Sequence, residues 1–198
     1  KPSWVELRKN KTDREKELPR PEMFKRSKGK QVILDKEFPN ITQKTLNEVI
    51  ASRRSLRQYK NVKITKEEVS YLLWETSRVD FYKSSAVFRT IPTGGATNAM
   101  ETYVYLQEID GIESGLYHYI QDQHLLVLLD DNNDLKERVN QSLWTQLRGA
   151  NFTMFLTATP YRSEYKYGFA AHKMIAMEAG HAGQNLSLAA EVIDCGAC

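Results

Sequence analysis

One long segment near the end of the sequence, Lys166–Ile193, constrains the fold more than any other stretch. It contains no proline, and about a third of its residues are Ala or Gly. Ala, Met, Leu, Gln and Glu favour helices, so the segment predicts one helix of about six or seven turns. Its apolar residues spread around the helix, which predicts burial on most sides. Small residues such as Ala176, Gly180 and Gly183 would admit a second backbone, so we expect burial in the domain and against a second subunit.

The composition is typical of one ordinary globular domain. The chain has 198 residues, of which 41% are hydrophobic and 27% charged, and its formal net charge is +3. That charge is too small to predict nucleic-acid or membrane binding, and no apolar run reaches the ~20 residues that span a bilayer. Two cysteines do not make a disulfide scaffold, so we expect a cytoplasmic protein.

Positive charge is concentrated near the start of the chain. Residues 1–30 hold eleven Lys or Arg against five Asp or Glu, and residues 1–40 contain four prolines. We therefore expect residues 1–40 to form an extended, solvated arm with one short strand near Val32–Leu34. Residues 41–198 are expected to form the folded domain.

Apolar periodicity predicts helices and strands in an order typical of an α+β domain. The expected helices are Thr42–Ser52 with Leu46, Val49 and Ile50 facing inward, a helix after the Thr65–Glu68 capping box, about Asn133–Leu147, and the long C-terminal helix. The expected strands are Glu101–Glu108, Gly115–Ile120, His124–Asp130 and Phe152–Thr159, while residues 77–100 are expected to form a long loop. This order predicts helices flanking a mostly antiparallel sheet.

The first candidate site is a cluster of three guanidinium groups and one hydroxyl, at Arg53, Arg54, Ser55 and Arg57. Guanidinium groups bind phosphate oxygens in pairs, and a serine adds a donor. Beside a helix end, this stretch is a candidate phosphate site. A solvated basic turn is the alternative.

The second candidate is the loop Pro92-Thr93-Gly94-Gly95. Paired glycines can turn backbone N–H groups toward an anion, or let a flat ring lie against the backbone. The stretch is neither a Walker loop nor a Rossmann fingerprint, and an ordinary turn is the alternative.

The third candidate is the adjacent pair Lys166-Tyr167. Lys and Tyr side by side can share a proton, and partial burial or a neighbouring positive charge can bring a pKa toward neutrality. A solvent-facing pair at the start of the long helix is the alternative.

Two other pairs point less clearly to chemistry. Glu178 and His181 have the i, i+3 spacing of di-iron helix bundles, but no second copy exists, so we interpret His181 as an interior, hydrogen-bonded histidine. Cys195 and Cys198 form a C-x-x-C that follows a helix, unlike a thioredoxin pair, and lack the other half of a zinc site. We expect no metal site.

The order of the motifs is more specific than any one of them. Along the chain come Arg-Arg-Ser-x-Arg (53–57), Arg-x-x-Pro-Thr-Gly-Gly-Ala (89–96), Glu-Thr-Tyr-Val (101–104), Gly-Leu-Tyr-His-Tyr (115–119), Lys-Tyr-Gly (166–168) and Glu-x-Gly-His-x-x-Gln-Asn-Leu (178–186). Over roughly residues 41–198, this set resembles the SagB-type dehydrogenases, a branch of the nitroreductase-like FMN flavoproteins. The last two blocks separate the branch from ordinary nitroreductases.

The resemblance implies a fold, a cofactor and roles for the candidate residues. The fold would be an α+β sandwich that forms a homodimer through long central helices and binds FMN at the interface. Arg53, Arg54, Ser55 and Arg57 match the contacts to the FMN phosphate and ribityl chain, and Pro92, Thr93, Gly94 and Gly95 match the loop against the isoalloxazine. Gln184 is similar to a polar residue facing the cofactor. Lys166 and Tyr167 match the acid–base pair of members that oxidise azolines to azoles in peptides.

One feature of the family has no counterpart in the sequence. Family members continue past the Gly-Ala-Cys block with a segment that approaches the flavin and an arm that embraces the partner subunit. This chain ends at Cys198, so we expect it to be truncated relative to the family.

Three functions follow as expectations. The first is a cytoplasmic FMN-dependent oxidoreductase that oxidises azolines in a modified peptide. The second is an NAD(P)H-dependent reductase of nitro compounds or quinones. The third is a non-catalytic flavin-binding or scaffold subunit of a modification complex.

Overall fold

A five-stranded sheet is the centre of the structure, a computed structural model that describes residues 4–7, 10–84 and 86–198. The strands lie in the order β1, β8, β7, β5, β9, and each neighbouring pair is antiparallel. They span Gln31–Ile33 (β1), Leu125–Asp130 (β8), Gly115–Ile120 (β7), Met100–Leu106 (β5) and Phe152–Ala158 (β9). The four strands predicted between positions 101 and 159 are confirmed, and the short strand expected near Val32–Leu34 is β1.

Helices cover both faces of this sheet because its side chains alternate between them. Val104 and Leu106 of β5 pack with Val69 and Leu73 of α3 (Lys66–Ser77) in the largest core cluster. Tyr105 points to the other face, where α4 (Leu135–Ser142) covers it with apolar side chains. The predicted capping box of α3 is confirmed, since Glu68 N donates to Thr65 Oγ1 at 3.2 Å and Thr65 N donates to Glu68 Oε2 at 2.6 Å.

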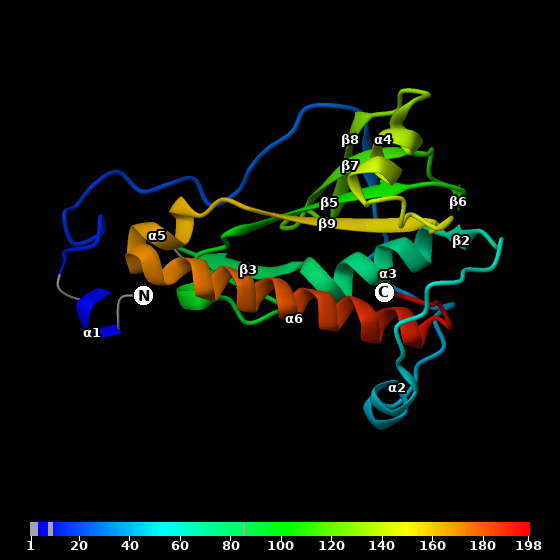
Figure 1. Cartoon of the computed structure of the whole chain (residues 1–198), viewed down its shortest axis with the longest axis horizontal. Coiled ribbons are helices and arrows are strands. Elements are labelled where there is room, and N and C mark those ends of the chain that lie inside the picture. The colour runs from blue at the N-terminus through cyan, green and yellow to red at the C-terminus, as the bar shows by residue number, and fades with distance from the viewer. Residues whose placement is uncertain (1–3, 8–9, 85) are drawn as a thin grey trace.

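The long helix α6 (Ala171–Val192) lies outside α3 and runs along the length of the molecule (Figure 1). It begins at Ala171 and not at Lys166, because Gly168 adopts φ 53° and ψ −140° and ends a separate helix, α5 (Tyr161–Tyr167). A 3₁₀ turn, η2 (Gly168–Ala170), joins the two helices. Lys166 and Tyr167 therefore lie in the last turn of α5, and the prediction that they begin the long helix is wrong.

The prediction of a structureless loop at residues 77–100 is also wrong. Val79–Lys83 (β3) and Ala86–Arg89 (β4) form an antiparallel hairpin, and Gly94–Ala96 form a 3₁₀ turn, η1. The hairpin is mostly exposed, so its sequence lacks the apolar alternation that marks a half-buried strand. Phe81 and Phe88 instead stack across it, with ring centroids 4.4 Å apart.

The remaining elements are short. Helix α2 (Leu46–Ser52) has a capping box at Thr45, and only its Val49 is buried. Leu46 and Ile50 are 64% and 57% exposed, so the prediction that they face inward is wrong.

A short parallel pair joins β2 (Ile64–Thr65) to β6 (Ile109–Asp110), and α1 spans Trp4–Leu7. Among the residues described above, no helix is long and apolar enough to cross a membrane.

Candidate functional site

Apart from Gln184, which lies within α6, the predicted site residues fall into two groups at opposite ends of that helix (Figure 1). Gly94 lies against Met174, near the start of the helix. Ser55 pairs with Ala197, just past its end. A helix of 22 residues is about 33 Å long, which exceeds the reach of a small cofactor. We call the two groups the glycine end, which also holds Lys166 and Tyr167, and the arginine end.

At the glycine end, Tyr167 explains why position 95 is a glycine. Gly95 adopts φ +63°, and a Cβ built there would lie 1.9 Å from the hydroxyl oxygen of Tyr167. A Cβ at Gly94 would lie 3.1 Å from the sulfur of Met174. Side chains of α5 and α6 in the same protomer therefore fill the space beside the two glycines. A ligand could contact the loop only at its exposed residues, Pro92 and Gly95.

The side-chain amine of Lys166 is hydrogen-bonded to the same glycine loop. Its Nζ donates a 2.8 Å hydrogen bond to the carbonyl oxygen of Gly95, and it lies 6.0 Å from the centre of the Tyr167 ring. The side chain is half-buried. Burial lowers the pKa of Lys166 below its ordinary value, and the positive charges of Arg14 and Arg20 lower it further. The structure thus brings three predicted elements together: the lysine, the tyrosine and the glycine loop.

Two buried hydroxyl groups that the sequence did not indicate fasten α5 to this loop. Thr97 Oγ1 donates to the carbonyl oxygen of Gly94 at 3.1 Å, and Ser163 Oγ lies 2.6 Å from Thr97 Oγ1. Because the Thr97 hydroxyl donates to Gly94, the Ser163 hydroxyl donates to Thr97. The chain Ser163–Thr97–Gly94 runs beside the Lys166–Gly95 bond, so α5 holds both glycine carbonyl groups.

The arginine end follows α2 and faces solvent. Arg53 is half-buried, whereas Arg54, Ser55 and Arg57 are exposed. The guanidinium of Arg54 folds back to donate to the carbonyl oxygens of Ala51 and Arg53, at 2.9 and 2.8 Å. The chain end supports the stretch, because Leu56 N donates to the carbonyl oxygen of Ala197 at 2.9 Å. Accessible guanidinium groups beside a serine hydroxyl form a donor set that suits a phosphate.

FMN has a phosphate at one end and a flat ring system at the other. The arginine end suits the phosphate, and the exposed edge of the glycine loop suits the ring. In one protomer these two surfaces lie near opposite ends of α6, a helix about 33 Å long. The residues therefore fit FMN only if a second copy of the chain brings its arginine end to the glycine end of the first.

Gln184 lies on the exposed face of α6, together with Met177 and Gly180. A Cβ added at Gly180 or Gly183 would meet no atom within 4 Å, so this face of the helix is open in the protomer. His181 also lies on it and is exposed. The prediction of an interior histidine is therefore wrong, because its helix face is covered by nothing in the described residues of the protomer.

Glu178, three residues before His181 on α6, is buried. It forms an ion pair with Arg89 of β4, with Oε1 and Nη1 3.2 Å apart and both side chains at most 1% exposed. Burial raises the pKa of Glu178 and lowers that of Arg89, while their mutual attraction opposes both shifts. Glu178 Oε2 and Arg89 Nε have no hydrogen-bond partner among the described residues. The pair therefore joins β4 to α6 close to the glycine loop at considerable electrostatic cost.

Of the two cysteines at the arginine end, Cys195 packs in an apolar cluster and Cys198 is exposed. Both are free thiols, and Cys198 Sγ lies 3.4 Å from the Tyr59 hydroxyl. Burial raises the pKa of Cys195 to about 11, which keeps that thiol protonated and unreactive at neutral pH. Within the described ranges, no three His, Cys, Asp or Glu side chains are grouped closely enough to hold a metal.

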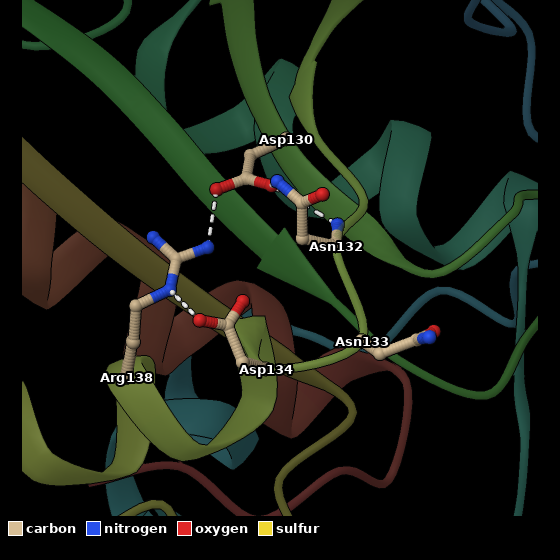
Figure 2. A pocket seen from close by; sticks show the side chains of 5 residues that line it. All are labelled: Asp130, Asn132, Asn133, Asp134 and Arg138. Atoms are coloured by element: carbon tan, nitrogen blue, oxygen red, sulfur yellow. Dashed lines mark hydrogen bonds and ion pairs between the residues drawn. The ribbon is translucent and has the colours of Figure 1, made fainter.

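The surface hollow in Figure 2 is separate from both ends. It is lined by Asp130, Asn132, Asn133, Asp134 and Arg138, from the end of β8 and the start of α4. Arg138 pairs with Asp130 and Asp134, and Asn132 donates to Asp130, so these groups bind one another. The Arg138 hydrogen bond lowers the pKa of Asp130. None of the predicted site residues lines this hollow.

Sequence comparison places the chain among oxidoreductases. Residues 50–198 match the profile described as "Nitroreductase family". The chain is 29% identical over 163 residues to MJ1384 of Methanocaldococcus jannaschii, named provisionally as a nitroreductase, and the match covers 81% of this chain and 80% of that protein. It is 27% identical over 132 residues to the trifolitoxin-processing protein TfxB of Rhizobium leguminosarum bv. trifolii, covering 63% of this chain and 35% of that protein.

Solved structures confirm the α+β fold. A provisionally assigned nitroreductase of Anabaena variabilis matches with a TM-score of 0.63 at 28% identity, over 76% of this chain and 31% of that one. A similarly assigned protein of Ralstonia eutropha matches with a TM-score of 0.62 at 20% identity, over 89% and 77%. The Escherichia coli microcin synthetase McbBCD complex, with truncated pro-MccB17 bound, matches with a TM-score of 0.55 at 21% identity, over 83% and 65%. The last two likenesses are of fold alone.

Proposed function

The chain belongs to the nitroreductase family, and from that premise we propose that it is an FMN-dependent oxidoreductase of the SagB type that oxidises azoline rings in a modified peptide to azoles. The ordered motifs support the branch. The likeness to a trifolitoxin-processing protein supports a peptide substrate. The observation that carries the proposal is the hydrogen bond from Lys166 to Gly95, because it unites the acid–base pair with the loop expected to face the flavin.

The proposed active unit is a homodimer. In an antiparallel pairing of two α6 helices, the arginine end of one protomer would lie beside the glycine end of the other. Arg53, Arg54, Ser55 and Arg57 of one copy would then hold the phosphate. The ring would rest on Pro92–Gly95 of the other copy, with Gln184 on the shared helix face. The open, small-residue face of α6 supports this pairing.

The chemistry divides between cofactor and protein. Bound FMN would supply the acceptor for the hydride that leaves a ring carbon of the azoline, with O₂ as the final acceptor of the two electrons. The accompanying proton goes to Lys166 or Tyr167. A lowered pKa makes the neutral amine of Lys166 more abundant at moderate pH, and its bond to Gly95 leaves the nitrogen lone pair for that proton.

Absorbance and mass spectrometry test this proposal together. The purified protein is expected to be yellow, or to gain absorbance near about 450 nm with added FMN, and to remove two hydrogen atoms from an azoline-containing peptide. Lys166→Met and Tyr167→Phe should keep the colour and lose the turnover. A protein that stays colourless after incubation with excess FMN and removal of the unbound flavin would falsify the proposal.

A second candidate is NAD(P)H-dependent reduction of nitro compounds or quinones, which the likeness to MJ1384 favours. The two candidates predict different substrates. Consumption of NAD(P)H with a quinone, unaffected by Lys166→Met, supports the reductase. Flavin binding without either turnover would indicate a flavin-binding scaffold subunit.

A further inference from the structure

Residues 13–25 run along α5, the helix that carries Lys166 and Tyr167, and we call them the N-terminal clasp (Figure 1). Its first half makes three hydrogen bonds to α5. Arg14 N donates to the carbonyl oxygen of Tyr165 at 2.9 Å, the Tyr165 hydroxyl donates to the carbonyl oxygen of Leu18 at 3.0 Å, and the Tyr161 hydroxyl donates to Asp13 at 3.2 Å.

The second half of the clasp meets a buried polar network centred on Arg162. This side chain is 4% exposed, and its Nε donates to the carbonyl oxygen of Glu22 at 2.6 Å. Its Nη1 donates to the carbonyl oxygen of Asn98 at 3.0 Å and to the carboxylate of Glu101. The guanidinium thus fastens three segments to one another: the clasp, strand β5 and helix α5.

The partners of Arg162 bind the clasp themselves. Glu101 accepts a 3.0 Å hydrogen bond from Lys25 N, and the Asn98 side chain donates to the carbonyl oxygen of Met23 at 2.7 Å. Glu101 also lies 3.3 Å from His118 Nε2, which ties the network to the neighbouring strand β7. The side chains of Arg162, Glu101 and His118 at the centre of this network are buried, so it tolerates little displacement, because a lost partner leaves a buried charge unpaired.

Arg162 lies one helical turn before Lys166 on α5, so a shift of the first moves the second. Between them, Ser163 bonds Thr97 of the glycine loop. We propose that Arg162 is a positioning residue through which the N-terminal clasp holds α5 where Lys166 bonds the Gly95 carbonyl. The clasp would then help to position the active site, although it lies outside residues 41–198, the part of the chain that resembles the family. This inference rests on the acid–base role of Lys166 in the proposed function.

The charges around Lys166 give the clasp a second effect. Arg14 and Arg20 of the clasp both act on the Lys166 amine. The glycine loop and the two residues that follow it, residues 92–97, carry no charged side chain. On the remaining side, Glu164 is paired with His172 of α6 at 2.7 Å. A loosened clasp would move positive charge away from Lys166 and admit water, and both changes raise its pKa toward the ordinary value.

The test compares Tyr165→Phe, which removes only the hydroxyl bond to Leu18, with Arg162→Lys, which keeps the charge facing Glu101 but loses the guanidinium geometry. The titration of Lys166 is followed by NMR of the protein with ¹³C-dimethylated lysines, with Lys166→Arg assigning the signal. Both variants should raise the pKa of Lys166. In azoline oxidation, kcat should fall a fewfold for Tyr165→Phe and about tenfold to a hundredfold for Arg162→Lys, with KM little changed.

Arg138→Lys on α4 is the matched control, because its guanidinium pairs only with Asp130 and Asp134 in the described structure. It should change neither the Lys166 titration nor kcat. A folded variant with a lower melting temperature but an unchanged Lys166 pKa and kcat would overturn the proposal. If Arg162→Lys does not fold, Tyr165→Phe decides the matter. The titration needs neither flavin nor substrate, so a responsive Lys166 in a protein that never oxidises azolines would refute the proposed function and leave the positioning role standing.

Discussion

The hydroxyl of Tyr167 occupies the place that a side chain at Gly95 would need. The two residues are 72 positions apart, yet a Cβ on Gly95 would come within 1.9 Å of that oxygen. A glycine at this position therefore does more than permit a turn: it makes room for a candidate catalytic group.

Gly95→Ala should damage the site more than the fold. The alanine must adopt φ +63°, which costs about 1 kcal/mol or more, and it must also displace Tyr167. We expect a small loss of stability and a large loss of azoline oxidation, measured by denaturant unfolding and by turnover of flavin-loaded protein. Gly149→Ala is the control, because Gly149 has φ +77° but no atom within 4 Å of its added Cβ. Equal activity in both variants would contradict the expectation.

Gly180→Leu distinguishes a lone protomer from a dimer. In a lone protomer the new side chain meets no atom within 4 Å, and replacing a helical glycine should stabilise the chain by up to about 1 kcal/mol. If α6 pairs with a second copy, the same leucine should instead separate the subunits and release bound FMN. Sedimentation velocity and the flavin absorbance measure both outcomes. Lys136→Leu, on the exposed side of α4, should leave a dimer intact.

Glu178→Gln should destabilise the protein strongly. It leaves the guanidinium of Arg89 buried without a counter-charge, which costs about 3–5 kcal/mol in comparable buried pairs. Urea unfolding should show this loss, and the double variant Glu178→Leu with Arg89→Met should recover much of it. Lys30→Met, which breaks the exposed pair between Lys30 and Glu113, should have little effect. Similar losses from Glu178→Gln and Lys30→Met would show that the buried pair is not tightly coupled.

His124 should make the fold sensitive to acid. Burial lowers its pKa from 6.5 to about 4, and the neutral ring accepts from the Tyr119 hydroxyl at 2.7 Å and donates to the Asp35 carbonyl oxygen at 2.8 Å. As the pH falls below 6.5, the unfolded chain binds a proton that the folded chain refuses until about pH 4. The free energy of unfolding should therefore fall across this window, by about 2 to 3 kcal/mol.

The control for this effect is His124→Asn, since asparagine tolerates the φ of 53° at this position. Urea unfolding at a series of pH values should give a flatter dependence for the variant, whatever its absolute stability. A slope equal to that of the unchanged protein would assign the acid sensitivity to other groups.

Local signals in the sequence predicted much of the fold. The Thr65–Glu68 capping box, the hairpin of β7 and β8 and the apolar strand β9 are each encoded within a few neighbouring residues. The break at Gly168 was missed, because Gly-Phe-Ala-Ala is compatible with a continuing helix and only the left-handed φ of Gly168 ends α5. The hairpin β3–β4 was missed because β3 is exposed at almost every position and only Val87 and Arg89 of β4 are buried, which leaves too little apolar alternation to mark a strand.

The candidate site was predictable in its parts and not in its connections. The glycine loop and the Lys166-Tyr167 pair are visible as motifs, but the bond between Ser163 and Thr97 joins residues 66 positions apart. Arg162 carries no sequence signal, because its partners are mostly backbone carbonyl groups. His181 was placed inside the protein from its helix alone, whereas the face that it occupies has no cover in the described protomer.

The division of the site between the two ends of α6 has a genetic consequence. If each flavin cleft takes its guanidinium groups from one subunit and its lysine from the other, two inactive proteins can rescue each other. A hybrid of Arg57→Ala and Lys166→Met chains would hold one cleft with both defects and one with none. If equal amounts of the two variants exchange subunits at random, about half of the dimers are hybrids, and each hybrid has one intact cleft of two. The mixture should then contain about a quarter of the normal number of intact clefts, although neither variant alone has any.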